Sequence, residues 1–370
     1  MNRFLPLTLA AGLVLSVSRL AVPPALPAAA PNGRFSLSGA RVHVYNLAGR
    51  VDLVAGSGRA VTIESATGGR DGGRIDVQTL PGNEPALIFA YPDKRIVYRR
   101  EGVVDDARNR RSQFRTTLEV GADGRFGDGW GKNGLGLGRR KVEIRSDGNG
   151  FEGWADLRIA IPAGQKASLH LGVGAVTVTN VDGDLLVDCA AASVTAQRTR
   201  GSLHVDTGSG AVEIRDGAGT VDVDTGSGAV SLINFTGSTV AIDTGSGSVK
   251  LAAVQAGRNL DVDTGSGSVE GVDVRSPRVS VDTGSGRVFL RLGANVETLD
   301  IDTGSGAVTV EAPAALDATV HMETGSGNLE VEFPMSSIRR ESDSLDGTIG
   351  NGRGRITLET GSGRIRLAKV

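Results

Sequence analysis

The sequence has little of several residue types on which folds and active sites often depend. Its 370 residues include one cysteine and four histidines, and only 4% of them are aromatic. A single cysteine excludes an intramolecular disulfide framework, and so few rings exclude a wide globular core of the usual composition. No segment resembles a nucleic-acid-binding module, so no nucleic-acid partner is expected. Glycine, in contrast, is abundant, with 54 residues.

Many of these glycines belong to a string, Asp-Thr-Gly-Ser-Gly-x-Val, that returns throughout the C-terminal half of the chain. Successive aspartates are separated by 18, 19, 20, 19 and 20 residues. The same Thr-Gly-Ser-Gly string follows Glu323 and Glu359. Sequence periods near 20 residues indicate a solenoid. The repeated aspartates are Asp206, Asp224, Asp243, Asp263, Asp282 and Asp302.

Each copy reads as strand, turn and strand. Val221 and Val223 alternate with polar residues before the turn, and apolar residues alternate again after it. A copy is too short to hold a typical helix as well, so it forms one rung of two or three short parallel strands, stacked about 4.8 Å from the next. We expect Gly226 and Gly228 to supply positive φ angles at the corner. We expect Asp224 to accept backbone N–H groups there in an Asx-turn.

The predicted fold is therefore all-β, a parallel β-solenoid (β-helix) of about ten rungs over residues 161–370. Residues 31–160 form an irregular β-rich N-terminal cap, with a Gly-rich loop at 121–138 and strands near 75–79, 96–100, 116–120, 142–145 and 155–161. Residues 333–353 interrupt the repeat and should bulge out as a long loop. The final copy, with alternating charges from Arg364 to Val370, should discourage end-to-end stacking of two rods.

Residues 1–30 have the pattern of a secretory signal peptide. Arg3 supplies the positive start, residues 5–17 the apolar core, and Ala28 to Ala30 the small residues near a cleavage site. The apolar run is too short for a membrane span, so none is expected once the signal is removed. The protein is expected to be exported and to be periplasmic, at the cell surface or extracellular.

The repeat also resembles an aspartic protease string, but the resemblance does not predict that enzyme. The protease needs two aspartates that share a proton across a cleft, whereas six at a fixed period form a ladder. A carbohydrate-active β-helix enzyme would need a compact catalytic cluster. The four histidines, His43, His170, His204 and His321, do not form one in sequence, although His170 and His204 should lie two rungs apart on one face. We therefore expect no enzyme.

The stacked aspartates leave a cation-binding alternative open. Carboxylates about 4.8 Å apart repel each other by about 1 kcal/mol in a water-like dielectric. Backbone N–H groups could relieve that repulsion, or a hard cation such as Ca²⁺ could bridge the oxygens. We favour a structural turn ladder without metal or cofactor. Cys189, in a decayed copy of the repeat, is expected to be a buried filler.

The function predicted from these features is a non-catalytic scaffold that binds other surfaces. Rows of Ser, Thr and Asp suit many weak contacts with a polysaccharide or a surface protein. The best candidate for a discrete contact is the pair Phe126 and Trp130 in the Gly-rich loop. The alternative is an envelope-stress or signalling accessory protein with one specific protein partner.

The chain resembles the bacterial putative-adhesin family, a family of unknown function with β-strand repeats. The resemblance rests on Ile161-Pro162-Ala163-Gly164, the repeated Gly-Ser-Gly-x-Val, the break at Phe333-Pro334 and the closing Thr360-Gly361-Ser362-Gly363-Arg364-Ile365. It covers most of residues 35–370. It implies an exported parallel β-solenoid at the bacterial cell envelope, and it carries no catalytic residues across.

Overall fold

A computed structural model describes residues 33–99, 114–127 and 138–370 of the chain. The chain divides into two compact units, residues 1–30 and 31–370, and all of the described residues belong to the second. The predicted signal peptide lies outside the described residues. Within the described ranges, no helix has both the length and the apolar character that a membrane crossing requires.

One rung of the unit consists of three short strand segments, as β16 (Val230–Thr244) and β17 (Val249–Thr264) show. The three segments of β16 each lie parallel to and in register with their counterparts in β17, with Val230 opposite Val249, Phe235 opposite Val254 and Val240 opposite Leu260. Neither rung can bury its apolar side alone, so the rungs stack. The predicted parallel solenoid is confirmed, with three strand segments in each of these two rungs.

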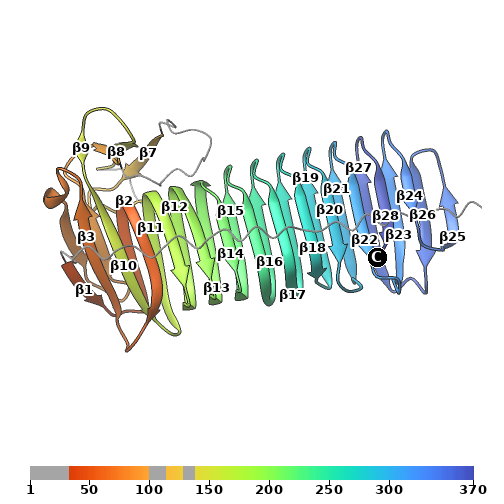
Figure 1. The fold of residues 1–370 in the computed structure, drawn as a ribbon, viewed down its shortest axis with the longest axis horizontal. Helices are drawn as coiled ribbons and strands as arrows, with labels where there is room; N and C mark the ends of the chain where they lie inside the picture. Colours follow the sequence, from red (N-terminus) through yellow and green to blue (C-terminus); the bar gives the residue numbers. More distant parts are fainter. Residues whose placement is uncertain (1–32, 100–113, 128–137) are drawn as a thin grey trace, which may run out of the picture. The chain divides into compact units, whose positions relative to one another are not determined.

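The stack continues along the second unit as a row of parallel strands (Figure 1). We call the side formed by the segments that precede the Thr-Gly-Ser-Gly corner the aspartate face. In the described part of the chain, eleven successive strands form this face. They are β2 (Arg41–Gly56), β11 (Gln165–Thr179), β12 (Asp182–Gln197), β13 (Arg200–Ser209), β15 (Ala218–Thr225), β16, β17, β19 (Arg278–Thr283), β21 (Thr298–Thr303), β27 (Gly354–Thr360) and β23 (Ala318–Thr324).

A second side follows the corner. Its strands are the later parts of β2, β11 and β12, then β14 (Val212–Arg215), the first parts of β16 and β17, β18 (Val269–Arg275), β20 (Val288–Leu292), β22 (Val308–Ala312), β28 (Ile365–Lys369) and β24 (Leu329–Val331).

The core is a continuous column of small aliphatic side chains between these sides. Val221, Val240, Leu260 and Val279 occupy equivalent inward positions in successive rungs, and all are buried. The alternating residues point outward, as period two in a strand requires. Each fully buried Val or Leu stabilises the stack by roughly 1.5–3 kcal/mol relative to exposure, so the regular valines account for the fold without large rings.

The Thr-Gly-Ser-Gly corner differs from our expectation in the role of its glycines. Gly226 and Gly228 do not have positive φ angles. A Cβ at Gly228 would instead lie 1.9 Å from the carbonyl oxygen of Gly210 in the preceding rung, and one at Gly247 would lie 1.8 Å from that of Gly228. The prediction of left-handed glycines was wrong here. Glycine is required because the backbones of adjacent rungs approach too closely for any side chain.

The threonine, rather than the aspartate, holds the corner together. The Thr244 hydroxyl donates to the carbonyl of Gly228 at 3.2 Å and accepts the N–H of Gly247 at 3.0 Å. It therefore joins one rung to the previous one and closes its own turn. Thr225 likewise accepts the N–H of Gly228 at 3.0 Å, whereas the side chain of Asp224 is exposed. The predicted Asx-turn was wrong, because the outward pleat directs Asp224 away from the corner.

A second corner, which the repeat string did not indicate, lies after the second side of each rung. In six successive rungs, one residue there has a φ of 52–57°, in the left-handed region that Asn and Asp tolerate better than other non-glycine residues. Neighbouring rungs are linked at this corner, since Asn234 Nδ2 donates to Asp216 Oδ1 at 2.6 Å. The corner residues are Asn180, Arg198, Asp216, Asn234, Ala253 and Asp273.

The N-terminal end is closed by antiparallel strands and a small second sheet. The strand β10 (Trp154–Pro162) pairs in parallel with β2 and antiparallel with β3 (Val61–Gly68), which pairs with β1 (Gly33–Leu37). Because β2 lies between β10 and β11, the predicted boundary near residue 160 is not a break in the stack. The other elements are η1 (Gly72–Arg74), β4 (Asp76–Leu80), β5 (Ala86–Ala90) and the four-stranded sheet of β6 (Arg95–Val97), β7 (Arg115–Val120), β8 (Arg140–Arg145) and β9 (Phe151–Glu152).

The C-terminal end departs from the order of the sequence. The final copy is not the last rung of the stack, because β27 lies between β21 and β23, and β28 lies between β22 and β24. The break at residues 333–353 is not a bulging loop either. It forms β25 (Ser336–Arg340) and β26 (Ser344–Ile349), and β26 pairs antiparallel with β23 beyond the last rung. The exposed end of the stack needs a cover, and this hairpin provides it.

Candidate functional site

The aspartate face carries a long regular array of polar side chains. We call the outward residues that directly precede the corner threonines the aspartate column. Strand pairing places them in register from rung to rung. Asp224, Asp243 and Asp282 are exposed. The column continues in register toward the N-terminus with the buried residues Asp188 and His170. Its members from there on are Asp206, Asp224, Asp243, Asp263, Asp282, Asp302, Glu359 and Glu323.

Electrostatic repulsion within the aspartate column is visible at Asp263. Partial burial and the neighbouring charges of Asp243 and Asp282 raise the pKa of its carboxyl. Like charges at one strand spacing disfavour the ionised form, so the column is a set of acceptors held close together against repulsion. A partner that donates hydrogen bonds to these carboxylates would relieve part of that cost.

A second column lies two residues earlier on the same strands, and we call it the mixed column. It includes His204, Asp222, Asp261, Asp300 and His321. His204 Nδ1 lies 2.9 Å from Asp222 Oδ2 on the next rung. In the aspartate column, His170 Nδ1 lies 2.9 Å from Asp188 Oδ2. His170 and His204 thus lie two rungs apart on one face, each paired with a carboxylate.

The N-terminal end of the aspartate face is covered. The rings of Tyr45 and His170 stack with centroids 4.3 Å apart, and Phe126 packs edge-on against Tyr45 at 5.8 Å. Burial raises the pKa of Tyr45 to about 12, and burial together with nearby His170 lowers the pKa of His43. Phe126 is only 3% exposed, so it forms part of this cover and offers no ring for surface contact. Trp130 lies outside the described residues, and the binding prediction for the loop now depends on it.

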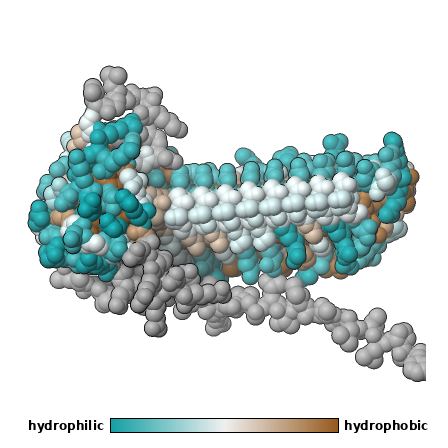
Figure 2. Space-filling model, turned by 90° about the horizontal axis from the view of Figure 1, so that it is seen from above, coloured by the Kyte–Doolittle hydropathy of each residue, from teal (hydrophilic) through white to brown (hydrophobic). Residues whose placement is uncertain are grey.

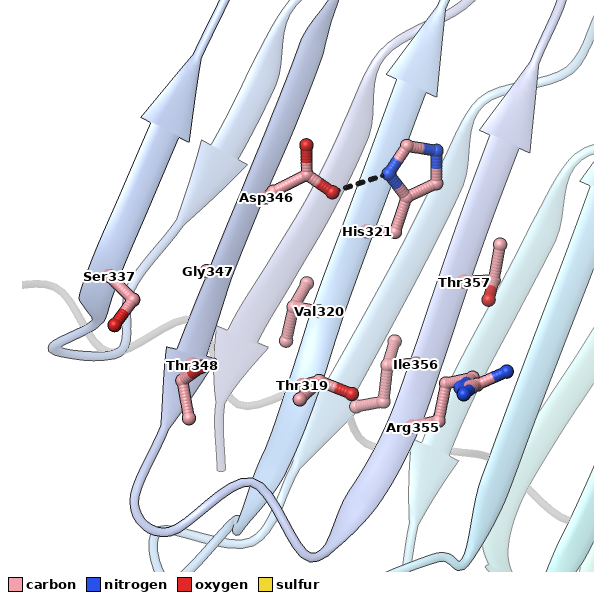
Figure 3. A pocket seen from close by; sticks show the side chains of 10 residues that line it. All are labelled: Thr319, Val320, His321, Ser337, Asp346, Gly347, Thr348, Arg355, Ile356 and Thr357. Carbon is pink, nitrogen blue, oxygen red and sulfur yellow. Dashed lines mark hydrogen bonds and ion pairs between the residues drawn. The ribbon is translucent and has the colours of Figure 1, made fainter.

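The C-terminal end of the aspartate face is open and contains a pocket of about 450 Å³ (Figure 3). It is formed where β26, β23 and β27 lie side by side. His321 on β23 and Asp346 on the neighbouring β26 lie side by side in its lining, with His321 Nδ1 2.8 Å from Asp346 Oδ1. The hydrogen bond to Asp346 raises the pKa of His321. The remaining polar lining residues are Thr319, Ser337, Thr348, Arg355 and Thr357.

Two features of the described residues bear on metal binding and on thiol chemistry. They contain no set of three His, Cys, Asp or Glu side chains arranged to hold a metal ion. Cys189 is buried and reduced, and burial raises the pKa of its thiol well above the ordinary value. A thiol with a raised pKa is a poor nucleophile at neutral pH, which fits the role of a core filler.

Sequence reasoning missed both the histidine pairs and the pocket. A signal for two of the pairs was present, since His170 and Asp188, like His204 and Asp222, are separated by 18 residues, one repeat period. The pocket had no such signal. Asp346 belongs to the segment that interrupts the repeat, and its strand reaches His321 only because β26 folds back antiparallel on β23.

Comparison with known proteins gives one family and one structure. Residues 157–368 match the Toastrack DUF4097 family. A crystal structure of a putative cell adhesion protein from Clostridium sporogenes is 9% identical and has a TM-score of 0.22, with 91% of this chain and 98% of that chain covered. A likeness at that TM-score supports no conclusion about fold or function. No curated protein matches the chain.

Proposed function

Because the chain belongs to the Toastrack DUF4097 family, a family of unknown function, we propose from the structure that it is a non-catalytic scaffold of the bacterial envelope that binds an extended polymer along the aspartate face. The observation that carries this proposal is the in-register repetition of outward carboxylates and hydroxyls over successive rungs. A polymer has a repeated structure of its own, so the same weak contact can form at many rungs.

The regular surface along the stack supports contact with a ligand over many rungs rather than at one catalytic centre. The aligned Gly-Ser-Gly corners have intermediate hydropathy, and Figure 2 shows a smooth pale ridge of this kind running along the stack between hydrophilic surfaces. A smooth and regular surface lets a long ligand lie in continuous contact. Many weak contacts on one chain give high total affinity through effective concentration. Export to the envelope, suggested by residues 1–30, belongs to the proposal.

The test is affinity electrophoresis of the full chain through gels that contain dextran, alginate or chitosan of graded lengths. The structure favours an affinity that rises with polymer length at constant sugar concentration. The triple variant Asp224→Asn, Asp243→Asn, Asp263→Asn should weaken binding at least tenfold. The control, with the same charge change on another side of the stack, is Glu213→Gln, Glu270→Gln, Glu311→Gln.

Equal binding by the triple variant and the wild type would overturn the proposal, and so would an affinity that does not depend on polymer length. A length-independent interaction with one protein from the envelope would instead support the alternative of an accessory protein with a specific partner.

A further inference from the structure

The pocket at the C-terminal end of the aspartate face has the size and the chemistry of a site for one sugar unit. Its volume of about 450 Å³ falls within the range of roughly 300–1,000 Å³ that is usual for small-ligand sites. It opens onto the same face that carries the two columns, since Thr357 and His321 continue the mixed column beyond Asp300. A polymer lying on the columns would reach it without leaving the face.

The pocket presents hydrogen-bond donors and acceptors at close and varied positions. Thr348 and Thr357 each provide a hydroxyl that can donate and accept, Arg355 provides donors only, and Asp346 provides acceptors. The Thr319 hydroxyl donates to the carbonyl of Gly354 at 3.2 Å and can accept a hydrogen bond from a ligand. Figure 3 shows these side chains on three neighbouring strands, and all of them line the same pocket. A ligand that donates and accepts through several adjacent hydroxyl groups can satisfy this set, whereas an apolar ligand cannot.

The charges around the pocket select against ionised ligands of either sign. Glu323 and Glu359 continue the aspartate column beside it, and Asp346 lies in its wall, so a carboxylate or phosphate ligand would be repelled. Arg355 also belongs to the lining, so an amine would meet its fixed positive charge inside. The opposed charges favour a neutral ligand with strong dipoles.

The ring of His321 is held in place by a neighbouring strand. Its Nδ1 atom is bound to Asp346 at 2.8 Å, and its Nε2 atom lies 3.6 Å from Glu323 Oε2. A side chain that is fixed before binding loses less conformational freedom when a ligand arrives. The pocket is therefore better prepared for a small ligand than the exposed columns are.

We propose that this pocket binds a neutral hexose unit of a glycan, through Arg355, Asp346 and the three threonine hydroxyls. The inference rests on the proposed function, because it identifies the polymer on the aspartate face as a neutral polysaccharide. The pocket binds one sugar unit of the glycan, and the aspartate column and the mixed column contact the units that follow.

The test is saturation-transfer NMR and calorimetry on the full chain with maltose, cellobiose and laminaribiose, compared with glucuronic acid and glucosamine. At least one neutral disaccharide should bind with a Kd below about 10 mM, and the two charged sugars should bind at least tenfold more weakly. Arg355→Gln and Thr357→Val should each reduce that affinity at least fivefold. The control is Arg278→Gln, because Arg278 lies two rungs away in the same register as Arg355.

Two results would overturn the inference: tighter binding of a charged sugar, or no saccharide bound below about 10 mM. The triple aspartate variant separates the two proposals because its substitutions lie outside the pocket. If polymer binding depends on the aspartates but no sugar enters the pocket, the pocket inference fails and the proposed function stands. If the pocket binds a disaccharide but the triple variant binds polymer like the wild type, the proposed function fails.

Discussion

The middle of the stack and its C-terminal end are built from the same repeat but are assembled differently. From β13 to β20, each rung contacts the rung that precedes it and the rung that follows it in sequence. At the C-terminal end, the last rung in sequence lies between two earlier ones, and an antiparallel hairpin covers the stack. The repeat thus specifies the strands and the corner of each rung. The structure of the C-terminal end depends instead on the order in which the last strands pair.

This difference has a physical origin in what each rung must satisfy. A middle rung has an equivalent rung on either side, so the same string satisfies both its apolar side and its backbone. A terminal rung has one free edge, and unpaired strand edges promote association with other chains. The interrupting segment 333–353 supplies β25 and β26 for that edge, and the final copy fills the place beneath it. The pocket that we assign to a ligand is formed by this rearrangement.

The largest effect that this comparison predicts follows from deletion of residues 354–370. Although they are the last residues of the chain, they form an internal rung, and their removal exposes the inward sides of β21 and β23 at once. Ile356, Leu358, Ile365 and Leu367 are all fully buried. We expect the melting temperature to fall by at least about 10 °C, measured by circular dichroism, with rapid proteolysis of residues 313–353.

The matched comparison is the deletion of residues 245–264, one complete period in the middle of the stack. That change joins Thr244 to Gly265 and preserves every corner, so the shortened stack has the same contacts between rungs. Its melting temperature should stay within about 5 °C of the wild type. If the two deletions are equally damaging, the terminal insertion has no special role.

The second prediction concerns the close approach of rungs at the corner. In Gly247→Ala, the new Cβ would lie 1.8 Å from the carbonyl oxygen of Gly228, which belongs to the backbone and cannot rotate away. Overpacking of this kind costs about 3 kcal/mol or more, measured by urea unfolding. The control is Gly257→Ala, because a Cβ there has its nearest neighbour at 3.5 Å. A similar cost for both variants would mean that backbone freedom, rather than close approach, explains the corner glycines.

The sequence predicted the fold to the extent that the fold is periodic. The period near 20 and the alternation of valine with polar residues determine rung, strand and core, and they place the aspartates in one column. The role of Gly228 and Thr244 could not be predicted, because it depends on how closely the backbones of two adjacent rungs approach each other. The sequence of one repeat does not determine that distance. The contact between Asp346 and His321 could not be predicted from the sequence either, since β26 pairs antiparallel with β23, unlike the parallel strands of the repeat. Phe126 looked like a surface ring because its loop is polar, yet it packs on Tyr45.

The smallest change in stability is expected for Asp263→Asn. This variant tests whether neighbouring carboxylates in the aspartate column repel each other. The pKa of Asp263 is raised from its ordinary value of 3.8 by partial burial and by Asp243 and Asp282, so ionisation destabilises the folded state. That penalty is present at neutral pH and disappears as the pH falls through the raised pKa and the carboxyl takes up a proton. The variant should therefore be more stable than the wild type by a few tenths to about 1 kcal/mol at pH 7 and low salt, with no gain near pH 3.

The control is Asp300→Asn, because Asp300 has Ser280 and Thr357 as its neighbours in the mixed column rather than acids. Melting curves at pH 3 and pH 7 measure the difference, and equal gains for the two variants would show that the spacing of one rung does not couple the carboxylates.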